Sequence, residues 1–376
     1  MKVLTIVGTR PEAIKMAPLI IGLKKDKFFE SKLCVTGQHR EMLDQVLNIF
    51  KIKPDYDLDL MRKNQELIDL TSLIILKLKP ILGAWKPELI LVHGDTATTF
   101  SASLAAYFFK IPIAHIEAGL RSGSIYSPWP EEGIRKMVSV IAEYNFTPTQ
   151  RSFNNLISEG VARSKIFVVG NTVVDALQMA IDTLNEDFKL IDKLKKEFSY
   201  LNESKKIILV TAHRREMLDS GLDNICAAIS RVSLRNPEAV FVFPVHLNPK
   251  IRKTTEKHLS NIKNVFLIKP LNYISFLYLM SISFFILTDS GGIQEEAPSL
   301  GKPVLLLRET TERPEGVEAG IVKIVGYEIN KIVTEIERLL DNNEIYDQMC
   351  SSINPYGDGL ASQRILSELK NKNESI

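Results

Sequence analysis

The chain has 376 residues, 45% of them hydrophobic and 24% charged, which indicates a globular protein of about two to three domains and excludes disorder and fibrous repeats. Its 47 basic and 45 acidic residues leave a net charge of +2, so no bulk charge recruits nucleic acid or an anionic membrane. Cys34, Cys226 and Cys350 lack CxxC spacing, which excludes a disulfide framework and a thiolate metal site and favours reduced thiols in the cytoplasm.

No targeting or membrane segment is visible. A Gly-Thr-Arg-Pro break at residues 8–11 interrupts the N-terminus before the apolar core of a signal peptide is complete. The longest nearly apolar stretch, 276–287, contains Ser281 and Ser283 and is shorter than the ~20 residues of a membrane helix, so it reads as a helix running into a buried strand. We expect a soluble, cytoplasmic protein without membrane or nucleic-acid partners.

Short β-branched runs alternate with longer amphipathic segments along the chain. The runs lack period-two alternation, which is typical of parallel strands covered on both faces. The predicted strands are 3–8, 33–37, 89–93, 111–116, 166–170, 207–212, 240–245, 265–268, 284–288 and 303–307. Helical patterns lie between them, such as 13–25, 66–82, 99–109 and 131–143. This alternation predicts an α/β fold with parallel sheets and right-handed crossovers.

The number of strands is too high for one doubly wound sheet. We predict two Rossmann-like doubly wound domains facing a cleft, an N-terminal domain at 1–170 and a C-terminal domain at 171–356. A polar stretch at 202–206 precedes the strand that opens the second sheet, and a last helix within 357–376 is expected to pack back on the first domain. The alternative, a closed (β/α)₈ barrel, requires about eight strands and no spacer in mid-chain.

Ligands of open parallel sheets bind at the carboxyl ends of the strands. The first strand ends at Gly8 and Thr9, with Arg10 beside them and Lys15 about one turn into the next helix. A glycine turn with two cations at a helix start suits a phosphate, although a solvated surface turn is the plainer interpretation. The pattern is not GxGxxG, which counts against a nicotinamide cofactor, and we expect none.

Carboxylates follow two further strands. Asp95 and Glu117 are expected to project from neighbouring strand ends and to raise each other's pKa, which suits acid–base chemistry near neutral pH; the alternative for Asp95 is a helix N-cap. A Pro-Trp-Pro segment leads into a helix that opens with Glu131 and carries Arg135. Acids in a first helical turn commonly just stabilise the helix dipole, so the role of Glu131 stays open at this point.

The second half of the chain contains the sharpest anion-binding signal. An apolar strand runs into Ser290, Gly291 and Gly292 at a helix start, where open backbone N–H groups suit a diphosphate. Glu296 follows about one turn later, where a carboxylate suits ribose hydroxyls, and Arg308 and Arg313 add positive charge at the next strand end. These features predict a nucleotide-diphosphate site.

Histidines end two strands of the second half. His213, followed by two arginines, fits a group that donates a proton beside a diphosphate, and His246 ends another strand where it faces a ligand. No HExxH or similar spacing occurs, so we expect no metal.

Five of these segments match, in order and spacing, the non-hydrolysing UDP-N-acetylglucosamine 2-epimerases of bacterial type. The segments are Gly8-Thr9-Arg10-Pro11-Glu12-Ala13, His93-Gly94-Asp95-Thr96, Glu117-Ala118-Gly119-Leu120-Arg121, Thr211-Ala212-His213-Arg214-Arg215-Glu216 and Asp289-Ser290-Gly291-Gly292-Ile293-Gln294-Glu295-Glu296. The resemblance spans nearly the whole chain. It implies a GT-B fold, a homodimer, and interconversion of UDP-GlcNAc and UDP-ManNAc without nicotinamide.

The resemblance also implies a mechanism and a set of site residues. UDP leaves C1 while a base removes the C2 proton, and UDP then re-adds to 2-acetamidoglucal with protonation on the other face. The implied acid–base residues are Asp95, Glu117, Glu131 and His213. The implied substrate-binding residues are Arg10, Lys15, Arg135, Leu271, Phe276, Ser290, Gly291, Gly292, Glu296 and Arg313.

Bacterial members resemble one another in a second, allosteric UDP-GlcNAc site. Gln38, Glu131, Arg214 and His246 match it, whereas Glu41 and Asn64 stand where some members have glutamine and arginine. The expected product feeds a capsule or another surface polysaccharide. Alternative functions are the hydrolysing relative that releases ManNAc and UDP, a GT-B glycosyltransferase, and a non-enzymatic UDP-sugar sensor.

Overall fold

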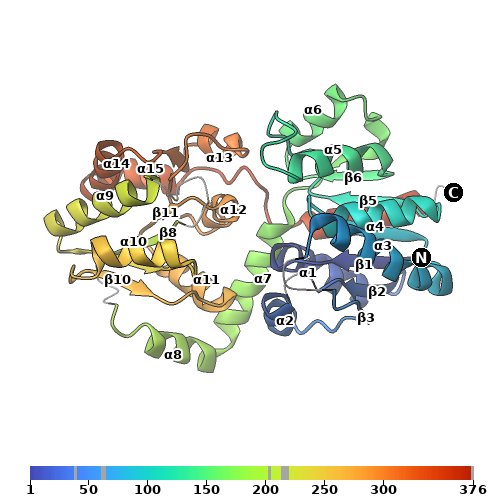
Figure 1. The fold of residues 1–376 in the computed structure, drawn as a ribbon, viewed down its shortest axis with the longest axis horizontal. Helices are drawn as coiled ribbons and strands as arrows, with labels where there is room; N and C mark the ends of the chain where they lie inside the picture. Colours follow the sequence, from blue (N-terminus) through green and yellow to red (C-terminus); the bar gives the residue numbers. More distant parts are fainter. Residues whose placement is uncertain (38–39, 61–64, 202–204, 213–219, 374–376) are drawn as a thin grey trace. The chain divides into compact units, whose positions relative to one another are not determined.

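A computed structural model describes residues 1–37, 40–60, 65–201, 205–212 and 220–373, with the side chains of 40–42 and 372–373 left out (Figure 1). Its internal contacts divide the chain into two compact units. The N-terminal unit comprises Met1–Ala180 together with Tyr356–Ile376, and the C-terminal unit comprises Ile181–Pro355.

A parallel sheet forms the centre of the N-terminal unit. Among the described residues its strand order is β3-β2-β1-β4-β5-β6-β7. The strands are β1 (Lys2–Val7), β2 (Glu30–Val35), β3 (Tyr56–Asp57), β4 (Leu89–His93), β5 (Ile113–Ile116), β6 (Tyr144–Thr147) and β7 (Ile166–Val168). Val3 pairs with Ser31 on one side and with Leu89 on the other. Since β1 and β4 are buried over nearly their whole length, both faces of the sheet must be covered.

Helices cover both faces of this sheet. They are α1 (Arg10–Lys25), α2 (Arg40–Ile49), α3 (Leu67–Trp85), α4 (Ala97–Phe108), α5 (Glu131–Ile141), α6 (Gln150–Ser158), the first part of α7 (Thr172–Glu186) and α16 (Ala361–Asn373). Helices α3, α4 and α5 pack in succession, and Ile74 and Leu78 of α3 share a core with Leu4 and Ile90 of the strands. Helix α1 packs with α2 and α16.

The C-terminal unit repeats this architecture. Its described strands form a parallel sheet in the order β10-β9-β8-β11-β12-β13. These are β8 (Lys206–Thr211), β9 (Ala239–Pro244), β10 (Val265–Ile268), β11 (Phe285–Thr288), β12 (Val304–Leu306) and β13 (Val322–Ile324). The helices are α8 (Phe188–Glu197), α9 (Gly221–Arg235), α10 (Pro249–Leu259), α11 (Tyr273–Ile282), α12 (Gly291–Ser299), α13 (Pro314–Glu318), α14 (Ile329–Asp341) and α15 (Asn343–Cys350).

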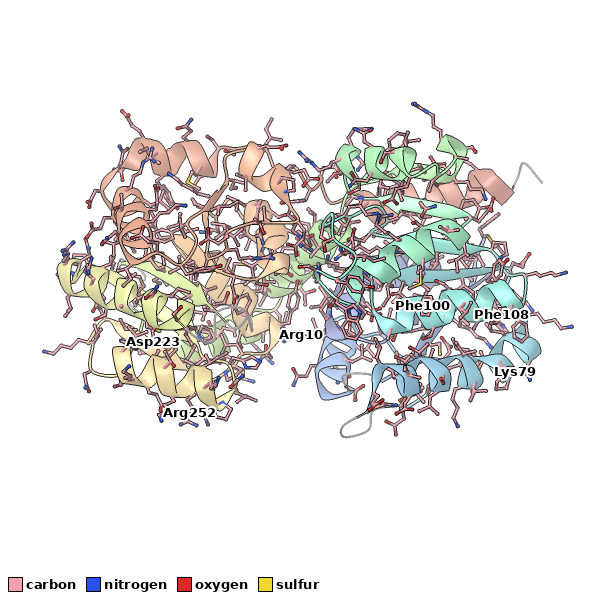
Figure 2. All side chains as sticks on the ribbon, turned by 45° about the horizontal axis from the view of Figure 1, so that its top comes forward. Arg10, Lys79, Phe100, Phe108, Asp223 and Arg252 are labelled. Atoms are coloured by element: carbon pink, nitrogen blue, oxygen red, sulfur yellow. The ribbon has the colours of Figure 1, made fainter. Side chains whose placement is uncertain are left out.

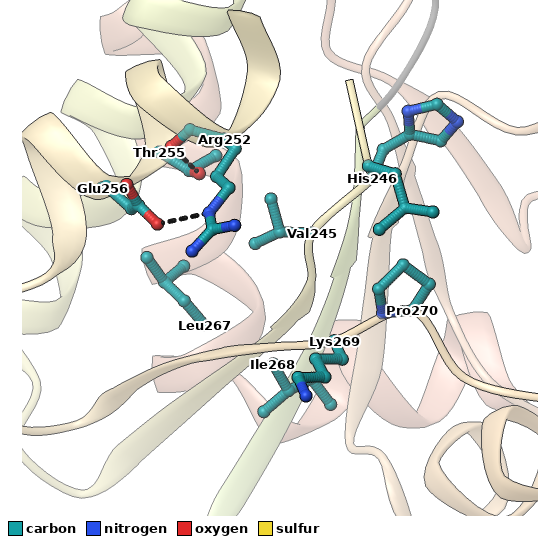
Figure 3. A pocket seen from close by; sticks show the side chains of 10 residues that line it. Val245, His246, Arg252, Thr255, Glu256, Leu267, Ile268, Lys269 and Pro270 are labelled. Atoms are coloured by element: carbon teal, nitrogen blue, oxygen red, sulfur yellow. Dashed lines mark hydrogen bonds and ion pairs between the residues drawn. The ribbon is translucent and has the colours of Figure 1, made fainter. Parts of the chain in front are cut away.

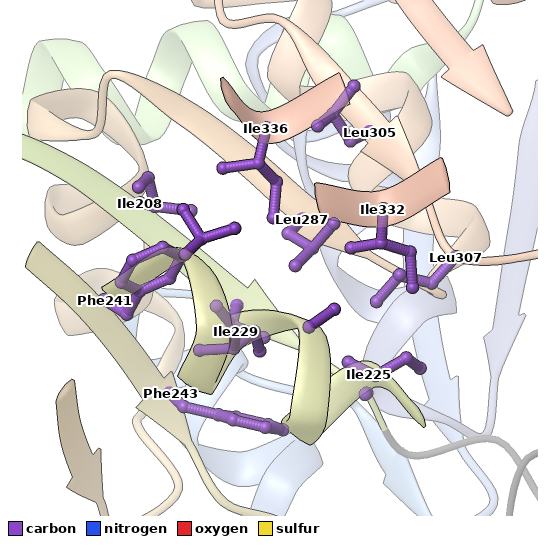
Figure 4. Close-up of a cluster of buried hydrophobic side chains, with 14 of the residues drawn as sticks. Ile208, Ile225, Ile229, Phe241, Phe243, Leu287, Leu305, Leu307, Ile332 and Ile336 are labelled. Atoms are coloured by element: carbon purple, nitrogen blue, oxygen red, sulfur yellow. The ribbon is translucent and has the colours of Figure 1, made fainter. Parts of the chain in front are cut away.

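The core of the C-terminal unit is a continuous apolar cluster between the sheet and two helices. Figure 4 shows Ile229 of α9 and Ile336 of α14 together with Phe241 and Leu287 of the strands, all of them fully buried. Burying side chains of this size contributes about 1.5–3 kcal/mol each. This packing holds the ends of β8 and β11 in place.

The predicted α/β class with two doubly wound parallel sheets is confirmed, and the barrel alternative is wrong because the sheets are separate and open. Each predicted strand is present with its ends shifted by a few residues. Three strands were not predicted. β3 has only two residues, the lysine at position 323 interrupts β13, and β6 contains buried Asn145 and Thr147 in place of a continuous apolar run.

The compact units divide within α7, after Ala180, whereas the predicted boundary lies near residue 170. Asp175 explains the difference, because its carboxylate accepts the backbone N–H groups of Ala361 (3.2 Å) and Ser362 (2.7 Å). The first half of α7 therefore holds the start of α16, and α16 packs on α1 within the N-terminal unit.

The three cysteines are free thiols. Cys34 and Cys226 are buried, and burial raises the pKa of each thiol to about 12, whereas Cys350 is half-buried. Within the described ranges, every helix is too short or too polar to cross a lipid bilayer.

Candidate functional site

Each sheet reverses its strand order once, and the candidate residues lie at these two places. The order reverses between β1 and β4 in the N-terminal unit and between β8 and β11 in the C-terminal unit. Ligands of doubly wound sheets bind at the carboxyl ends of the strands beside such a switch point. Gly8 and Asp95 follow β1 and β4, while Ala212 and Asp289 follow β8 and β11. Each unit therefore carries its own set of candidate residues, called the N-terminal cluster and the C-terminal cluster.

Glu12 joins the two loops at the first switch point. Its carboxylate is 2% exposed and accepts the backbone N–H groups of Gly8 (2.9 Å) and Thr9 (2.6 Å). It also accepts the hydroxyl groups of Thr96 (2.6 Å) and Thr99 (3.2 Å). Burial raises the pKa of Glu12, and these hydrogen bonds oppose that shift. Because one carboxylate bonds to both loops, the backbone next to Arg10 and Asp95 is held in place.

Lys15 and Glu117 form an ion pair in the same cluster. The ammonium of Lys15, on α1, donates to Oε2 of Glu117, which directly follows β5. His93 Nε2 lies 3.8 Å from the same carboxylate oxygen. Glu117 has a φ of 64°, in the left-handed region that a glutamate rarely adopts, and such strain is common at functional sites. The predicted proximity of Lys15 to a phosphate stays a prediction, since its charge is matched here by Glu117.

Asp95 forms the second ion pair of the cluster. Its Oδ2 accepts from Arg135 at Nε (2.8 Å) and Nη2 (2.6 Å), while Nη1 of Arg135 donates to Glu132 (2.8 Å). The alternative role of Asp95 as an N-cap is wrong, because Thr96 caps α4 through its side chain. Asp95 and Glu117 each pair with a cation, and the expected coupling between the two carboxylates stays a prediction.

Glu131 is the first residue of α5, the helix that also presents Arg135. Its Oε2 atom is buried and accepts no hydrogen bond within the described part of the chain. The acid–base role of Glu131 therefore stays a prediction.

Two buried groups support the strand-end loops. His115 is fully buried, and its Nε2 lies 2.7 Å from the Gly94 carbonyl oxygen; burial lowers the pKa of His115 to about 4, so the ring is neutral at pH 7. Arg121 donates to both carboxylate oxygens of Glu159 (2.9 and 2.6 Å), and these bonds lower the pKa of Glu159 to about 2. Together they position the loops that contain Asp95 and Glu117.

The C-terminal cluster lies at the N-terminus of α12. The helix begins at Gly291, and the side chain of Ser290 makes no capping bond, so the first N–H groups are not covered by it. A side-chain carbon at Gly292 would meet nothing within 4 Å, whereas one at Gly291 would lie 2.8 Å from Nη1 of Arg313. Arg313 therefore lies against the first turn of the helix. This is the anion-binding geometry that the Ser-Gly-Gly pattern predicts.

Acidic residues hold Arg313 in this position. Its Nε donates to Glu295 (2.5 Å) and its Nη1 to Glu312 (2.9 Å). Arg308 donates to the other oxygen of Glu312 (2.7 Å). Glu296, the predicted ribose ligand, is 9% exposed on the same helix. The predicted residues of α12 follow β11, and Arg308 and Arg313 follow β12, so both groups lie at the carboxyl ends of neighbouring strands.

Leu271 and Phe276 flank the start of α11. Leu271 lies in the connection after β10, and Phe276 lies in the first turns of α11; both are half-buried. Asn272 caps the helix between them by accepting the N–H of Ser275 (2.9 Å). A capped helix start leaves the backbone of the preceding residue in a defined place, and the substrate-binding role of Leu271 stays a prediction.

His246 lines a separate pocket of about 440 Å³ within the C-terminal unit (Figure 3). The pocket lies at the carboxyl ends of β9 and β10 beside α10, where Arg252 is paired with Glu256 (2.7 Å). The Nδ1 atom of His246 accepts the backbone N–H of Asn248 (3.1 Å). His246 is thus at a strand end beside a cavity, as its sequence position predicts.

Several predicted residues lie outside the described part of the chain. They are Gln38, Asn64, His213 and Arg214, together with the side chain of Glu41, whose backbone belongs to α2. Among the residues that are described, no cluster of three or more potential ligands is arranged to hold a metal ion.

The sequence analysis missed three acidic residues of the two clusters: Glu12, Glu132 and Glu295. The spacing Thr9-x-x-Glu12 is a capping-box signal that was available in the sequence. Glu132 stands three residues before Arg135, on the same side of α5, which is also a readable pattern. The pairing of Glu295 with Arg313 depends on tertiary packing, so no local sequence pattern predicts it.

A sequence model described as UDP-N-acetylglucosamine 2-epimerase matches residues 22–370 of this chain. The chain belongs to the UDP-N-acetylglucosamine 2-epimerase family. The relative from Yersinia pestis is 54% identical over 371 residues and covers 99% of both chains. The relative from Escherichia coli K12 is 53% identical over 376 residues, which is all of both chains. Both carry the name UDP-N-acetylglucosamine 2-epimerase.

A solved structure of the family supports the fold. The UDP-GlcNAc 2-epimerase of Neisseria meningitidis, bound to UDP-GlcNAc, matches with a TM-score of 0.94 and 51% identity, covering 99% of this chain and 100% of that one. The family resemblance drawn from the five sequence segments is therefore confirmed, and so is the α/β fold of GT-B type.

Proposed function

We propose that this chain interconverts UDP-GlcNAc and UDP-ManNAc without net hydrolysis. The observation that carries the proposal is a pair of carboxylate–cation contacts at the strand ends of the N-terminal unit, the buried Lys15–Glu117 pair and the half-buried Asp95–Arg135 pair. They occur in a chain that matches, over its full length, a relative solved with UDP-GlcNAc bound. A protein that only binds the nucleotide needs contacts with the diphosphate, but it does not need several groups that can transfer protons.

The chemistry of the sugar explains why such groups are needed. The proton on C2 is not acidic, because no carbonyl group adjoins C2 in the ring. Loss of UDP from C1 together with the C2 proton gives 2-acetamidoglucal, and re-addition of UDP with protonation on the other face gives the epimer. We assign these proton transfers to Asp95, Glu117, Glu131 and His213. The first three lie in or beside the N-terminal cluster, and His213 is assigned from the sequence.

Departure of UDP is stabilised by positive charge and backbone donors. We assign the diphosphate to Ser290, Gly291, Gly292 and Arg313 at the start of α12, where the helix dipole and the guanidinium act on the leaving oxygen. Further assignments of the proposal are Glu296 to the ribose, Leu271 and Phe276 to the uracil, and Arg10, Lys15 and Arg135 to substrate binding.

The proposal extends to assembly and regulation. We propose a cytoplasmic homodimer whose UDP-ManNAc supplies ManNAc units to a surface polysaccharide such as a capsule. We further propose a second, allosteric UDP-GlcNAc site that includes Gln38, Glu41, Arg214 and His246. The support for His246 is its place at a strand end beside a cavity of about 440 Å³.

Product analysis tests the proposal. Purified protein is incubated with UDP-GlcNAc, and the products are separated by anion-exchange chromatography. The proposal predicts UDP-ManNAc in equilibrium with UDP-GlcNAc and no net accumulation of UDP. Accumulation of UDP with free ManNAc in equal amounts would establish the hydrolysing reaction instead. Tight UDP binding without any turnover would favour the sensor.

A further inference from the structure

A buried histidine joins the two segments that carry Asp95 and Glu117. His115 lies on β5, two positions before Glu117, and its side chain is completely buried. Its Nε2 atom lies 2.7 Å from the carbonyl oxygen of Gly94, the residue directly before Asp95. Figure 2 labels Phe100 in the first turn of α4, the helix into which this loop leads. One side chain of β5 therefore bonds to the loop between β4 and α4.

Gly94 is held to β5 through both groups of its backbone. Its N–H donates to the carbonyl oxygen of Ile116 (2.9 Å), and its own carbonyl oxygen is bonded to His115. Gly94 has a φ of 68°, a conformation that glycine adopts without strain. A side-chain carbon at Gly94 would lie 3.7 Å from Oε1 of Glu117, so this carboxylate lies against the loop. Gly94 is thus next to Asp95 in sequence and next to Glu117 in space.

The bond to His115 also determines how Asp95 leaves the strand. The peptide group between Gly94 and Asp95 is planar. Holding its carbonyl oxygen therefore fixes the whole plane, including the nitrogen from which Asp95 starts. The carboxylate of Asp95 is then held at its far end by Arg135 (2.6 Å). The position of Asp95 thus depends on a backbone contact from β5 as well as on its ion pair.

The chemistry of the contact defines the state of the ring. A carbonyl oxygen only accepts hydrogen bonds, so Nε2 of His115 must carry the hydrogen. Nδ1 is buried and has no hydrogen-bond partner within the described residues. Burial lowers the pKa of His115 to about 4; His93 and Arg121 add to this shift, while Asp95 and the Gly94 bond oppose it. The ring is therefore neutral at pH 7, with its hydrogen on Nε2.

Asn145 provides a comparison for His115 within the same sheet. It is the register partner of His115 on β6 and is equally buried. Neither the nitrogen nor the oxygen of its side chain has a hydrogen-bond partner within the described residues. Of these two neighbouring polar side chains, His115 alone bonds to a loop at the strand ends.

We propose that His115 is a positioning residue of the reaction, which sets the place of Asp95 relative to Glu117 through its Nε2–H bond to Gly94. The inference rests on the proposed function, since it takes both carboxylates as acid–base groups. His115 itself transfers no proton and does not touch the substrate, because its ring is buried beneath the loop. Misplacing a reacting group by about 1 Å lowers a rate about 100-fold. Loss of the bond is therefore expected to lower turnover rather than substrate binding.

Steady-state kinetics of variants at this position test the bond. The side-chain nitrogen of glutamine takes the place of Nε2, whereas the shorter asparagine side chain ends near the place of Nδ1. His115→Gln is therefore expected to keep most of the wild-type kcat. His115→Asn, equally polar but too short to reach Gly94, is expected to lower kcat about 100-fold while the KM for UDP-GlcNAc stays within about threefold.

Asn145→Leu is the matched control for these variants. It replaces the neighbouring buried polar side chain by an apolar one of similar size, and we expect wild-type kcat. Circular dichroism and urea unfolding establish that each variant is folded.

NMR of the protein with ¹⁵N-labelled histidine tests the bond in the wild-type chain. The two ring nitrogens of a neutral histidine have different ¹⁵N shifts, which identify the one that carries the hydrogen. The signal of His115 is the one that is absent in His115→Gln. We expect the hydrogen on Nε2 throughout the range of about pH 5 to 8, unlike a solvated histidine, which titrates near pH 6.5. A hydrogen on Nδ1, or titration of the ring near pH 6.5, would overturn the proposed bond.

The outcomes separate this inference from the proposed function. A wild-type protein that binds UDP but does not convert UDP-GlcNAc would overturn the proposed function and, with it, the use of the bond in the reaction. Conversion by the wild type with an unchanged kcat in His115→Asn would overturn the positioning role alone. So would an equal loss of kcat in His115→Gln and His115→Asn, or a comparable loss in Asn145→Leu, since packing of the sheet would then explain the result. If His115→Asn does not fold, the histidine NMR of the wild type decides.

Discussion

Lys15 and Glu117 form a buried ion pair that joins α1 to the turn after β5, with both side chains less than 10% exposed. The two residues are 102 positions apart in the chain, and Glu117 takes a left-handed backbone conformation where the pair forms. The pair therefore links the segments that follow the first and the fifth strands along the chain, β1 and β5, beside the switch point of the sheet.

Removing one partner of this pair has a predictable result. Lys15→Met leaves the Glu117 carboxylate buried without its cation, and the free energy of unfolding is expected to fall by about 3–5 kcal/mol in urea titrations. The pKa of Glu117 rises as well, so the acid limb of the kcat–pH profile moves to higher pH. Lys15→Met/Glu117→Gln is expected to recover part of the stability but none of the activity. Equal urea midpoints for Lys15→Met and wild type would contradict this account.

Asp95 is expected to be essential for turnover but not for nucleotide binding. Asp95→Asn removes the charge that pairs with Arg135 while keeping the shape of the side chain, and kcat is expected to fall about 10²–10⁴-fold. UDP binding, measured by calorimetry, is expected to stay within about threefold of wild type, since the proposed diphosphate contacts lie on α12. Asp223→Asn, at a surface carboxylate paired with His258 (2.7 Å), is the control. A sensor would keep its function in both variants.

Two glycines with the same backbone conformation separate strain from steric overlap. Gly119 and Gly123 have φ values of 86° and 85°. A side-chain carbon at Gly119 would overlap the carbonyl oxygen of Ser152, whereas one at Gly123 would meet nothing within 4 Å. Gly123→Ala is expected to cost about 1–2 kcal/mol from the left-handed conformation alone. Gly119→Ala is expected to cost at least ~2 kcal/mol more, measured by urea unfolding. Equal losses would contradict the packing of this loop against α6.

The Arg121–Glu159 pair predicts a pH dependence of stability. Hydrogen bonds from Arg121 lower the pKa of Glu159 to about 2, below its ordinary value of 4.5. Between these two pH values the unfolded chain binds more protons than the folded one. The stabilisation is therefore complete above about pH 4.5 and is lost as the pH falls toward 2.

Glu159→Gln tests this directly. The urea midpoint of the variant is expected to lie below that of wild type at pH 7, and the difference is expected to narrow between pH 5 and 3. Its size is expected to stay below about 1 kcal/mol, because Glu159 is partly exposed to solvent. A difference that stays constant over this pH range would show that the charge of Glu159 is not the cause.

Local patterns in the sequence predicted the sheets, since continuous apolar runs such as 89–93 coincide with β4. They also predicted the open helix start at Gly291, because glycines after an apolar strand are a local signal. The partners of charged residues were not predictable in this way. Arg135 was predicted to bind substrate, but its contact with Asp95 joins residues 40 positions apart.

Glu12 illustrates the same limit. Its capping box with Thr9 is visible in the sequence, but its bonds to Thr96 and Thr99 depend on β1 and β4 being neighbours in the sheet. The strand order that makes them neighbours is a property of the whole fold. Local sequence therefore identifies which residues lie at the strand ends, and packing decides how they pair.

Proton NMR in D₂O with UDP-GlcNAc and no added nicotinamide tests the central claim most directly. Elimination and re-addition require the C2 proton to leave and a solvent deuteron to replace it. The account predicts loss of the sugar H2 signal together with growth of UDP-ManNAc. Formation of UDP-ManNAc with the original H2 proton fully retained, or no change in a protein that still binds UDP, would contradict it.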